Sequence, residues 1–295
     1  MKFNILLANL KPHLWEMVSD TVHFVRGALE ACGETVTVST NQLDPDAINL
    51  FIDRFYEEPE FPLKLKAGGY RFGLVCTEVI GEDGSWNYGA EQDDPNVYAL
   101  YRLAAEAAEF VWVLLEESLA ACRAMNPNSA VLPLGYLDSI ETLPKTPWES
   151  RDIDFLLCGF GSPRRGKVVQ ALAEAGHTVV YPAIPVPAYV RDSLMERTKI
   201  NMSVQKTDRH GIVSATRLCH SIINRVPVLL EYSGGATPYD TYCLRAEPKT
   251  LVDDCLAALA RDDLEAHAET AYRRFKEDRP MMSMMQRVLT ETLRQ

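Results

Sequence analysis

The stretch from residue 154 to residue 176 brings small residues and cations together at the start of an expected helix. Its sequence, DFLLCGFGSPRRGKVVQALAEAG, indicates an apolar strand, a short loop and a helix that carries Arg164, Arg165 and Lys167 in its first turn. Cations there are unfavourable beside the positive end of the helix dipole, by about 0.3–1 kcal/mol each, unless an anion neutralises them. Because a helix start also offers free backbone N–H groups, the stretch predicts a phosphate site.

The loop of this stretch contains residues small enough for a phosphate to approach the backbone, namely Gly159, Gly161 and Ser162. It matches neither of two common phosphate motifs, because the third glycine of GxGxxG is displaced to Gly166 and the GK[ST] of a P-loop is missing. A solvated basic helix start is the alternative explanation. The position at a turn from strand to helix favours the phosphate site.

A second polar stretch, from residue 194 to residue 231, places side chains at a turn of the same kind. A strand ends near Gln205, a polar loop contains His210, and the next helix carries Ser214 and Arg217 away from its apolar face. Arg217 is expected to point from the helix start toward a cleft at the strand ends. His210 has no catalytic partner beside it in the sequence, and a lone loop histidine more often orients a ligand or faces solvent than acts as a base.

The elements that must position these residues alternate along the whole chain. Short apolar runs alternate with amphipathic helical patterns, which is typical of βαβ units and parallel sheets. Strands are expected at residues 2–8, 35–39, 72–77, 110–115, 130–133, 154–158, 178–181, 200–204 and 226–230. Helices are expected at residues 14–31, 98–108, 118–125, 164–175, 190–196, 212–224 and 248–260, and from about 262 to the C-terminus.

A proline-containing segment without periodicity, LPKTPWE at residues 143–149, indicates a linker between two domains. The predicted fold class is α/β, with a Rossmann-like domain over residues 1–145 and another over residues 146–295. Two such domains facing each other across a cleft would bind a ligand between them, at the carboxyl ends of their strands.

Composition excludes several classes of protein. The 295 residues carry a net charge of −11, which argues against a broad surface for duplex DNA or anionic membranes. No apolar run approaches the roughly 18 residues of a membrane span, and the opening MKFNILLANL indicates a first buried strand rather than a signal peptide. The seven scattered cysteines form no CxxC pair and no zinc spacing, so we expect buried thiols in a soluble cytoplasmic protein.

The second half resembles CgeB-like, family-1-type bacterial glycosyltransferases of the GT-B fold. Their C-terminal domains have a strand, a glycine loop, Pro-Arg-Arg and a helix, followed by a strand that begins Lys-Ile and a helix with Gly-Ile and Arg-Leu. The resemblance covers residues 152–231 well, has weaker matches in the first half at Glu78 and at the LPLGY of residues 132–136, and is thin before residue 71. The matching residues of the second half are Gly159, Pro163, Arg164, Arg165, Lys199, Ile200, Asn201, Gly211, Ile212, Arg217, Leu218, Asn224, Arg225 and Glu231.

The resemblance implies transfer of a sugar from a nucleoside-diphosphate donor to an acceptor hydroxyl, with no cofactor. The C-terminal domain would bind the donor and the N-terminal domain the acceptor, whose class (glycan, small molecule, protein or nucleobase) stays open, as does the oligomeric state. Arg164 and Arg165 would contact the pyrophosphate and stabilise the leaving diphosphate without a metal. The last helix, about residues 270–293, would cross back onto the N-terminal domain.

One residue departs from the family pattern. Relatives carry a glutamate at the start of the helix where this chain has Ser214, and a serine would bind the donor ribose about 1 kcal/mol less tightly, since it lacks charge. A catalytically inactive GT-B-like protein that binds a nucleotide or a sugar is therefore the alternative. A nicotinamide-dependent oxidoreductase is a weaker one, because the displaced glycine and the missing acidic residue argue against it.

The acceptor side should supply a general base within reach of the acceptor hydroxyl. Glu78, which ends the apolar run LVCTE, is the first candidate, and His13 in the loop after the first strand is the second. Glu78 equally fits a structural carboxylate that caps a helix or pairs with an arginine. Trp86 and Tyr88, in a long polar loop, are interpreted as exposed rings that bind the acceptor or a second subunit.

Overall fold

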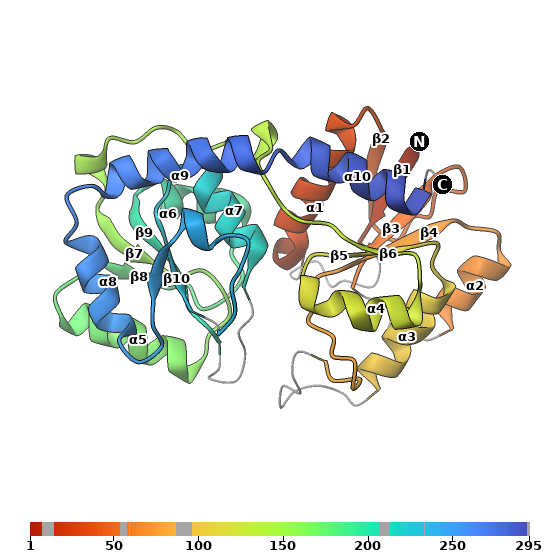
Figure 1. The fold of residues 1–295 in the computed structure, drawn as a ribbon, viewed down its shortest axis with the longest axis horizontal. Helices are drawn as coiled ribbons and strands as arrows, with labels where there is room; N and C mark the ends of the chain where they lie inside the picture. The colour runs from red at the N-terminus through yellow and green to blue at the C-terminus, as the bar shows by residue number, and fades with distance from the viewer. Residues whose placement is uncertain are drawn as a thin grey trace. The chain divides into compact units, whose positions relative to one another are not determined.

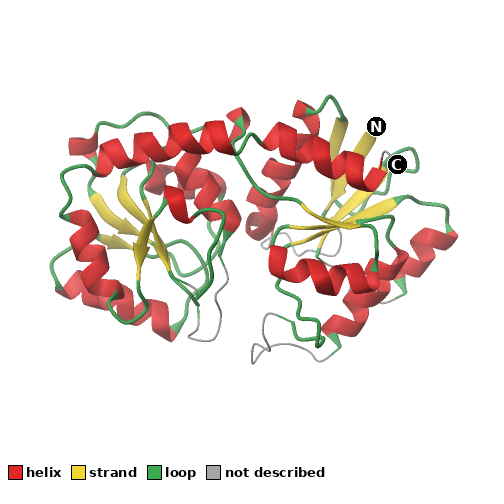
Figure 2. Ribbon diagram, viewed as in Figure 1, coloured by secondary structure: helices red, strands yellow, loops and turns green. Residues whose placement is uncertain are grey.

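The computed structural model describes residues 1–7, 15–53, 58, 60–86, 96–206, 213–232 and 234–293 (Figure 1). The chain divides into two compact units, of which one comprises Met1–Leu134 with Met281–Gln295 and the other Gly135–Pro280. Each unit is built on a parallel sheet with helices on both faces (Figure 2). The predicted α/β class with two Rossmann-like domains is therefore confirmed.

The first unit contains a six-stranded sheet in the order β2-β1-β3-β4-β5-β6. The chain passes from β1 to β2 on one side and then to β3 on the other, so the strand order reverses between β1 and β3. Ligands of open parallel sheets bind outside the carboxyl ends of the strands at such a point. The strands are β1 (Lys2–Leu6), β2 (Thr35–Ser39), β3 (Ile48–Ile52), β4 (Phe72–Cys76), β5 (Val111–Val113) and β6 (Ser129–Val131).

Two groups of helices cover this sheet. The helices α2 (Phe61–Ala67), α3 (Val97–Ala107) and α4 (Leu119–Met125) pack on one face, and α1 (Trp15–Ala31) and α10 (Met281–Leu293) lie together on the other (Figure 1). The terminal helix α10 is anchored by the fully buried Trp112, whose indole N–H donates to Thr292 Oγ1 at 3.1 Å.

The second unit has a five-stranded sheet in the order β11-β10-β9-β7-β8, which reverses between β7 and β9. Helices α5 and α8 pack on the face that carries Phe155, Ile200 and Leu229, and α6 packs on the opposite face. The strands are β7 (Ile153–Leu156), β8 (Val179–Val180), β9 (Thr198–Ser203), β10 (Val228–Glu231) and β11 (Leu244–Ala246). The helices are α5 (Pro163–Glu174), α6 (Ala188–Glu196), α7 (Ala215–Ile223), α8 (Leu251–Leu259) and α9 (Leu264–Asp278).

The boundary between the units lies at Leu134, earlier than the expected residue 145. Asn224, at the end of α7, holds the intervening segment: its Oδ1 accepts from the amides of Thr142 and Leu143 at 2.9 Å, and its Nδ2 donates to Ile140 O at 2.9 Å. The segment therefore belongs to the second unit.

The expected last helix consists of two helices. α9 ends at Asp278 and α10 begins at Met281, because a proline at position 280 cannot continue a helix and disfavours a helical residue before it. The helix that returns to the first unit thus begins at Met281 rather than near residue 270.

We expect the change Asn224→Ala to lower the free energy of unfolding by about 2 kcal/mol, because it leaves several backbone groups without partners. Urea denaturation of the two proteins measures this. Asn224→Asp keeps the oxygen that accepts from Thr142 and Leu143, so it should lose less. Unchanged stability of the alanine variant would show that the segment is held by something else.

The strands and helices of the sequence analysis are all present, but three of the strands and α-helices in the described residues were not predicted. These are β3, β11 and α2. A short apolar run such as INLFI of β3 has no alternation that distinguishes a buried strand from part of a helix. Among the described helices, none combines the length and the apolar character that a membrane span requires.

Candidate functional site

The predicted phosphate loop lies at the carboxyl end of β7, beside the point where the strand order of the second unit reverses. Ser162 caps α5, since its Oγ accepts from the amide of Arg165 at 3.2 Å, and Pro163 occupies the first helical position. Gly161 donates its N–H to Ala183 O at 2.8 Å. The helix end of the loop is thus fixed by hydrogen bonds of the protein itself.

Arg165 joins this loop to the end of β9. Its Nε and Nη2 donate to Val204 O at 2.9 and 2.8 Å, and its Nη1 donates to Phe160 O at 2.9 Å. Only 8% of the residue is exposed, and this burial lowers the pKa of the guanidinium, which nevertheless stays charged. No described carboxylate forms an ion pair with Arg165. Its positive charge beside the loop is therefore not balanced by such a pair.

Arg217 approaches the same point from the first turn of α7. A methyl group built on Gly159 would lie 2.9 Å from Arg217 Nη2 and 3.0 Å from Arg165 Nη1, so both guanidinium groups border the α-carbon of this glycine. Gly159 has a φ of +135°, a conformation that other residues rarely adopt. Two positive groups that converge on a glycine favour an anion beside it.

Arg164 has a different environment from the one that the sequence suggested. Its Nη1 donates to Gln205 O at 3.2 Å and to Glu231 Oε2 at 3.0 Å, and its Nη2 pairs with Glu231 Oε1. Glu231 is 1% exposed and also accepts from the amide of Gln205 at 2.7 Å. For Arg164, the neutralising anion is therefore the protein's own Glu231. This role was not predicted, because 67 residues separate Arg164 from Glu231 in the sequence.

The remaining predicted donor residues are only partly described. Ser214 is the N-cap residue of α7 without a capping hydrogen bond from its side chain, and it lies three residues before Arg217. The backbone of Gln205 takes part in the contacts of Arg164 and Glu231. His210 lies outside the described residues. The structure thus brings Gly159, Arg165 and Arg217 together, with Ser214 at the start of the same helix as Arg217.

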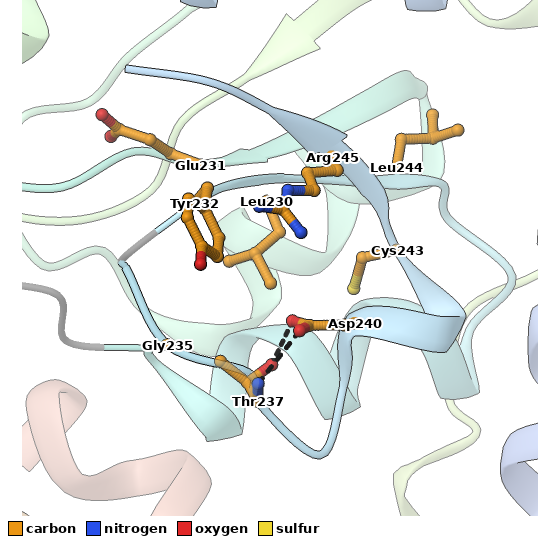
Figure 3. A pocket seen from close by; sticks show the side chains of 9 residues that line it. All are labelled: Leu230, Glu231, Tyr232, Gly235, Thr237, Asp240, Cys243, Leu244 and Arg245. Atoms are coloured by element: carbon orange, nitrogen blue, oxygen red, sulfur yellow. Dashed lines mark hydrogen bonds between the residues drawn. The ribbon is translucent and has the colours of Figure 1, made fainter.

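A loop with two glycines, Gly234 and Gly235, follows β10. Figure 3 shows Thr237 tied to Asp240, whose carboxylate accepts from the Thr237 amide at 3.0 Å. Arg245 stacks on the ring of Tyr232 at 3.6 Å. These residues line a cavity of about 10 Å³, which holds about one water molecule. A sugar or a nucleotide does not fit this cavity.

In the first unit, Glu78 follows β4 on a firmly held segment. Ser118 Oγ donates to the carbonyl of Glu78 at 2.7 Å and accepts from the amide of Ile80 at 3.0 Å. His13, the second predicted base, and Tyr88 lie outside the described residues. Trp86 was predicted to be exposed, which is wrong: it is 8% exposed and packs edge-on against Tyr101 at 5.2 Å.

Asp53, a residue that the sequence analysis did not identify, lies one position beyond β3, at the carboxyl edge of the sheet. Its carboxylate accepts from the Thr77 amide at 2.9 and 3.0 Å and from the Thr77 hydroxyl. The residue is buried and has a φ of +52°, which is unusual for a residue other than glycine. Strained residues of this kind persist where the surroundings fix them, often at functional sites. Asp53 thus holds the residue before Glu78.

Metal ligands do not gather in the described ranges, where no group of three His, Cys, Asp or Glu side chains is arranged to hold an ion.

The comparisons with known proteins concern the fold. No family model matches the chain, and no curated protein sequence matches it. Among solved structures, apo OtsA has a TM-score of 0.61 at 11% identity, with 99% of each chain covered. Sucrose-phosphate synthase from Thermosynechococcus elongatus also has a TM-score of 0.61 at 11% identity and covers 99% of this chain and 98% of its own.

A third structure is named as a putative epimerase rather than a transferase. The putative UDP-N-acetylglucosamine 2-epimerase from Listeria monocytogenes has a TM-score of 0.55 at 12% identity, with 98% of this chain and 95% of its own covered. At such identities the likeness concerns the fold alone. Together with the two parallel sheets, these neighbours show that the chain has the GT-B fold.

Proposed function

We propose that this protein is a glycosyltransferase that moves a sugar from a nucleoside-diphosphate donor to an acceptor hydroxyl. The observation that carries the proposal is the convergence of Arg165 and Arg217 on Gly159, at the reversal point of the second sheet. Guanidinium groups bind phosphate oxygens through paired hydrogen bonds, and a glycine lets the diphosphate approach the backbone. The structural neighbours support the reaction class, since they include a UDP-forming α,α-trehalose-phosphate synthase from Burkholderia xenovorans.

The two guanidinium groups would also act in the chemical step. When the bond between sugar and diphosphate breaks, negative charge develops on the leaving phosphate, and fixed cations stabilise this charge without reorganisation. In this proposal the transfer needs no metal ion, Ser214 binds the donor ribose, and the enzyme is CgeB-like. Glu78 is the proposed base, with His13 as the other candidate. Asp53 and Ser118 would hold the Glu78 segment so that the carboxylate meets the acceptor hydroxyl.

A thermal-shift titration with UDP, GDP, dTDP, ADP and CMP tests the donor site. One nucleotide should stabilise the fold by about 2.7 kcal/mol at a hundred times its dissociation constant. Arg217→Met should abolish this stabilisation. The control Arg273→Met removes the same charge from an exposed position of α9 and should leave it unchanged. The donor site is contradicted if no nucleotide raises the stability of the protein, or if the nucleotide stabilises the Arg217 variant as much as the wild type.

The second candidate is a protein that binds the nucleotide but does not transfer a sugar. The observation in its favour is Ser214, which offers the ribose a neutral hydroxyl at the start of α7. Incubation of the wild type with the sugar conjugate of the binding nucleotide separates the two functions. Release of nucleoside diphosphate that Glu78→Gln reduces much more than donor affinity supports the enzyme, whereas binding without any release supports the binding protein.

A further inference from the structure

A second and larger cavity of the second unit lies between the starts of α5 and α8. Both helices begin at the carboxyl edge of the sheet, since α5 follows β7 and α8 follows β11. The cavity has a volume of about 260 Å³. In the same measure roughly 10–15 Å³ holds one water molecule, so the space accommodates a small molecule. None of the contacts described for the Gly159 loop fills it.

Its lining is positive although the chain is acidic. Arg164, Lys167 and Lys249 line the cavity against a single carboxylate, Asp253, in a protein whose net charge is −11. Glu231 already neutralises Arg164. Lys167 and Lys249 form no ion pair with any residue that the structure describes. Lys167 lies on α5 and Lys249 just before α8, so an anion in the cavity would relieve the repulsion between these like charges.

The start of α8 adds hydrogen-bond donors to the same wall. Thr250, the N-cap residue, makes no capping bond to the helix backbone, and its hydroxyl donates to Asp254 Oδ2 at 2.8 Å. Leu251 and Val252, in the first helical turn, line the cavity. Backbone N–H groups of a first turn have no acceptor within the helix. The cavity is therefore bordered by two ammonium groups and by the start of α8, whose first turn also carries Asp253 and Asp254.

We propose that this cavity is an anion site that binds the phosphate group of a small phosphorylated molecule through Lys167 and Lys249. Ammonium groups bind phosphate as point charges, without the directional pairing of a guanidinium. The inference does not depend on the proposed transferase activity. The phosphate belongs either to the nucleotide donor or to a separate phosphorylated ligand, and the experiment distinguishes these sources.

Isothermal titration calorimetry with inorganic phosphate, against sodium chloride of equal ionic strength, tests the site. Because the Gly159 loop is itself a proposed phosphate site, the titration is done in the Arg217→Met background, which should still bind one phosphate saturably. Adding Lys167→Ala with Lys249→Ala to this background should weaken the affinity at least about tenfold. A matched control removes two exposed lysines that do not line the cavity, through Lys66→Ala with Lys145→Ala, and should change the affinity less than about twofold. Absence of saturable binding, or equal weakening in both double variants, overturns the proposal.

The nucleotide that binds in the thermal-shift panel then identifies the source of the phosphate. If the Lys167 and Lys249 variant loses phosphate and nucleotide binding together, the cavity holds the donor's own phosphate. If it loses phosphate but keeps the nucleotide, the cavity is a separate site for a phosphorylated molecule. Phosphate binding in a protein that binds none of the nucleotides would support this site while contradicting the proposed function.

Discussion

Replacing Glu231 with glutamine should lower the free energy of unfolding by about 3 kcal/mol, because it leaves a largely buried charge without its partner. Glu231 accepts from the guanidinium of Arg164 and from the amide of Gln205 at 2.7 Å. Glutamine keeps the shape, but it has no charge and one of its terminal groups can only donate. The Arg164 side chain is 18% exposed, so water would replace the lost hydrogen bonds of its guanidinium only in part. Urea denaturation at pH 7 measures the loss.

A double-mutant cycle shows whether this loss comes from the pair. Arg164→Met alone leaves the buried carboxylate without its partner, and Glu231→Gln alone leaves the guanidinium without its partner. The double variant leaves neither charge unpaired. Its loss of unfolding free energy should therefore be smaller than the sum of the two single losses by at least about 1 kcal/mol. Strictly additive losses would mean that the two side chains stabilise the unit independently of each other.

The same pair shows what the sequence could reveal about the site. Glycines, a proline and cations between a strand and a helix were sufficient to predict the turn at residues 159–165, because each residue type there has a local conformational reason. The partner of Arg164 is a residue at the end of another strand. Its identity depends on which strands are neighbours, and a single sequence does not contain that information.

The first unit shows how one missed strand hides a site residue. Without β3, the run INLFI has no assigned place, and Asp53 after it is only an acidic residue in a polar segment. Once β3 is known to pair with β1 and β4, Asp53 falls at the reversal point of the sheet, next to Thr77. The prediction that Trp86 is exposed was wrong for a related reason. A long polar loop suggested exposure, but the chain folds back through the Ile80–Trp86 bridge and buries the ring.

Replacing Gly159 with alanine should abolish nucleotide binding and lower the free energy of unfolding by about 1–3 kcal/mol. At a φ of +135° the backbone is strained for any residue with a β-carbon. The added methyl group would meet Arg217 Nη2 at 2.9 Å and Arg165 Nη1 at 3.0 Å. Arg217 can move away, but the guanidinium of Arg165 is held by three hydrogen bonds to carbonyl oxygens. The guanidinium groups of Arg165 and Arg217, which should bind the diphosphate together, are therefore pushed apart.

Gly166, seven residues further along, provides the matched control for this prediction. It lies within α5, and a methyl group built there meets no atom within 4 Å. Gly166→Ala should therefore raise the free energy of unfolding by about 0.5–1 kcal/mol, as alanine does inside a helix, and leave nucleotide binding unchanged. Urea denaturation and the nucleotide titration of both variants separate backbone strain from loss of the site. If Gly159→Ala loses stability but binds the nucleotide as tightly as Gly166→Ala, the two arginines do not bind the diphosphate at Gly159, and the donor site lies elsewhere in the chain.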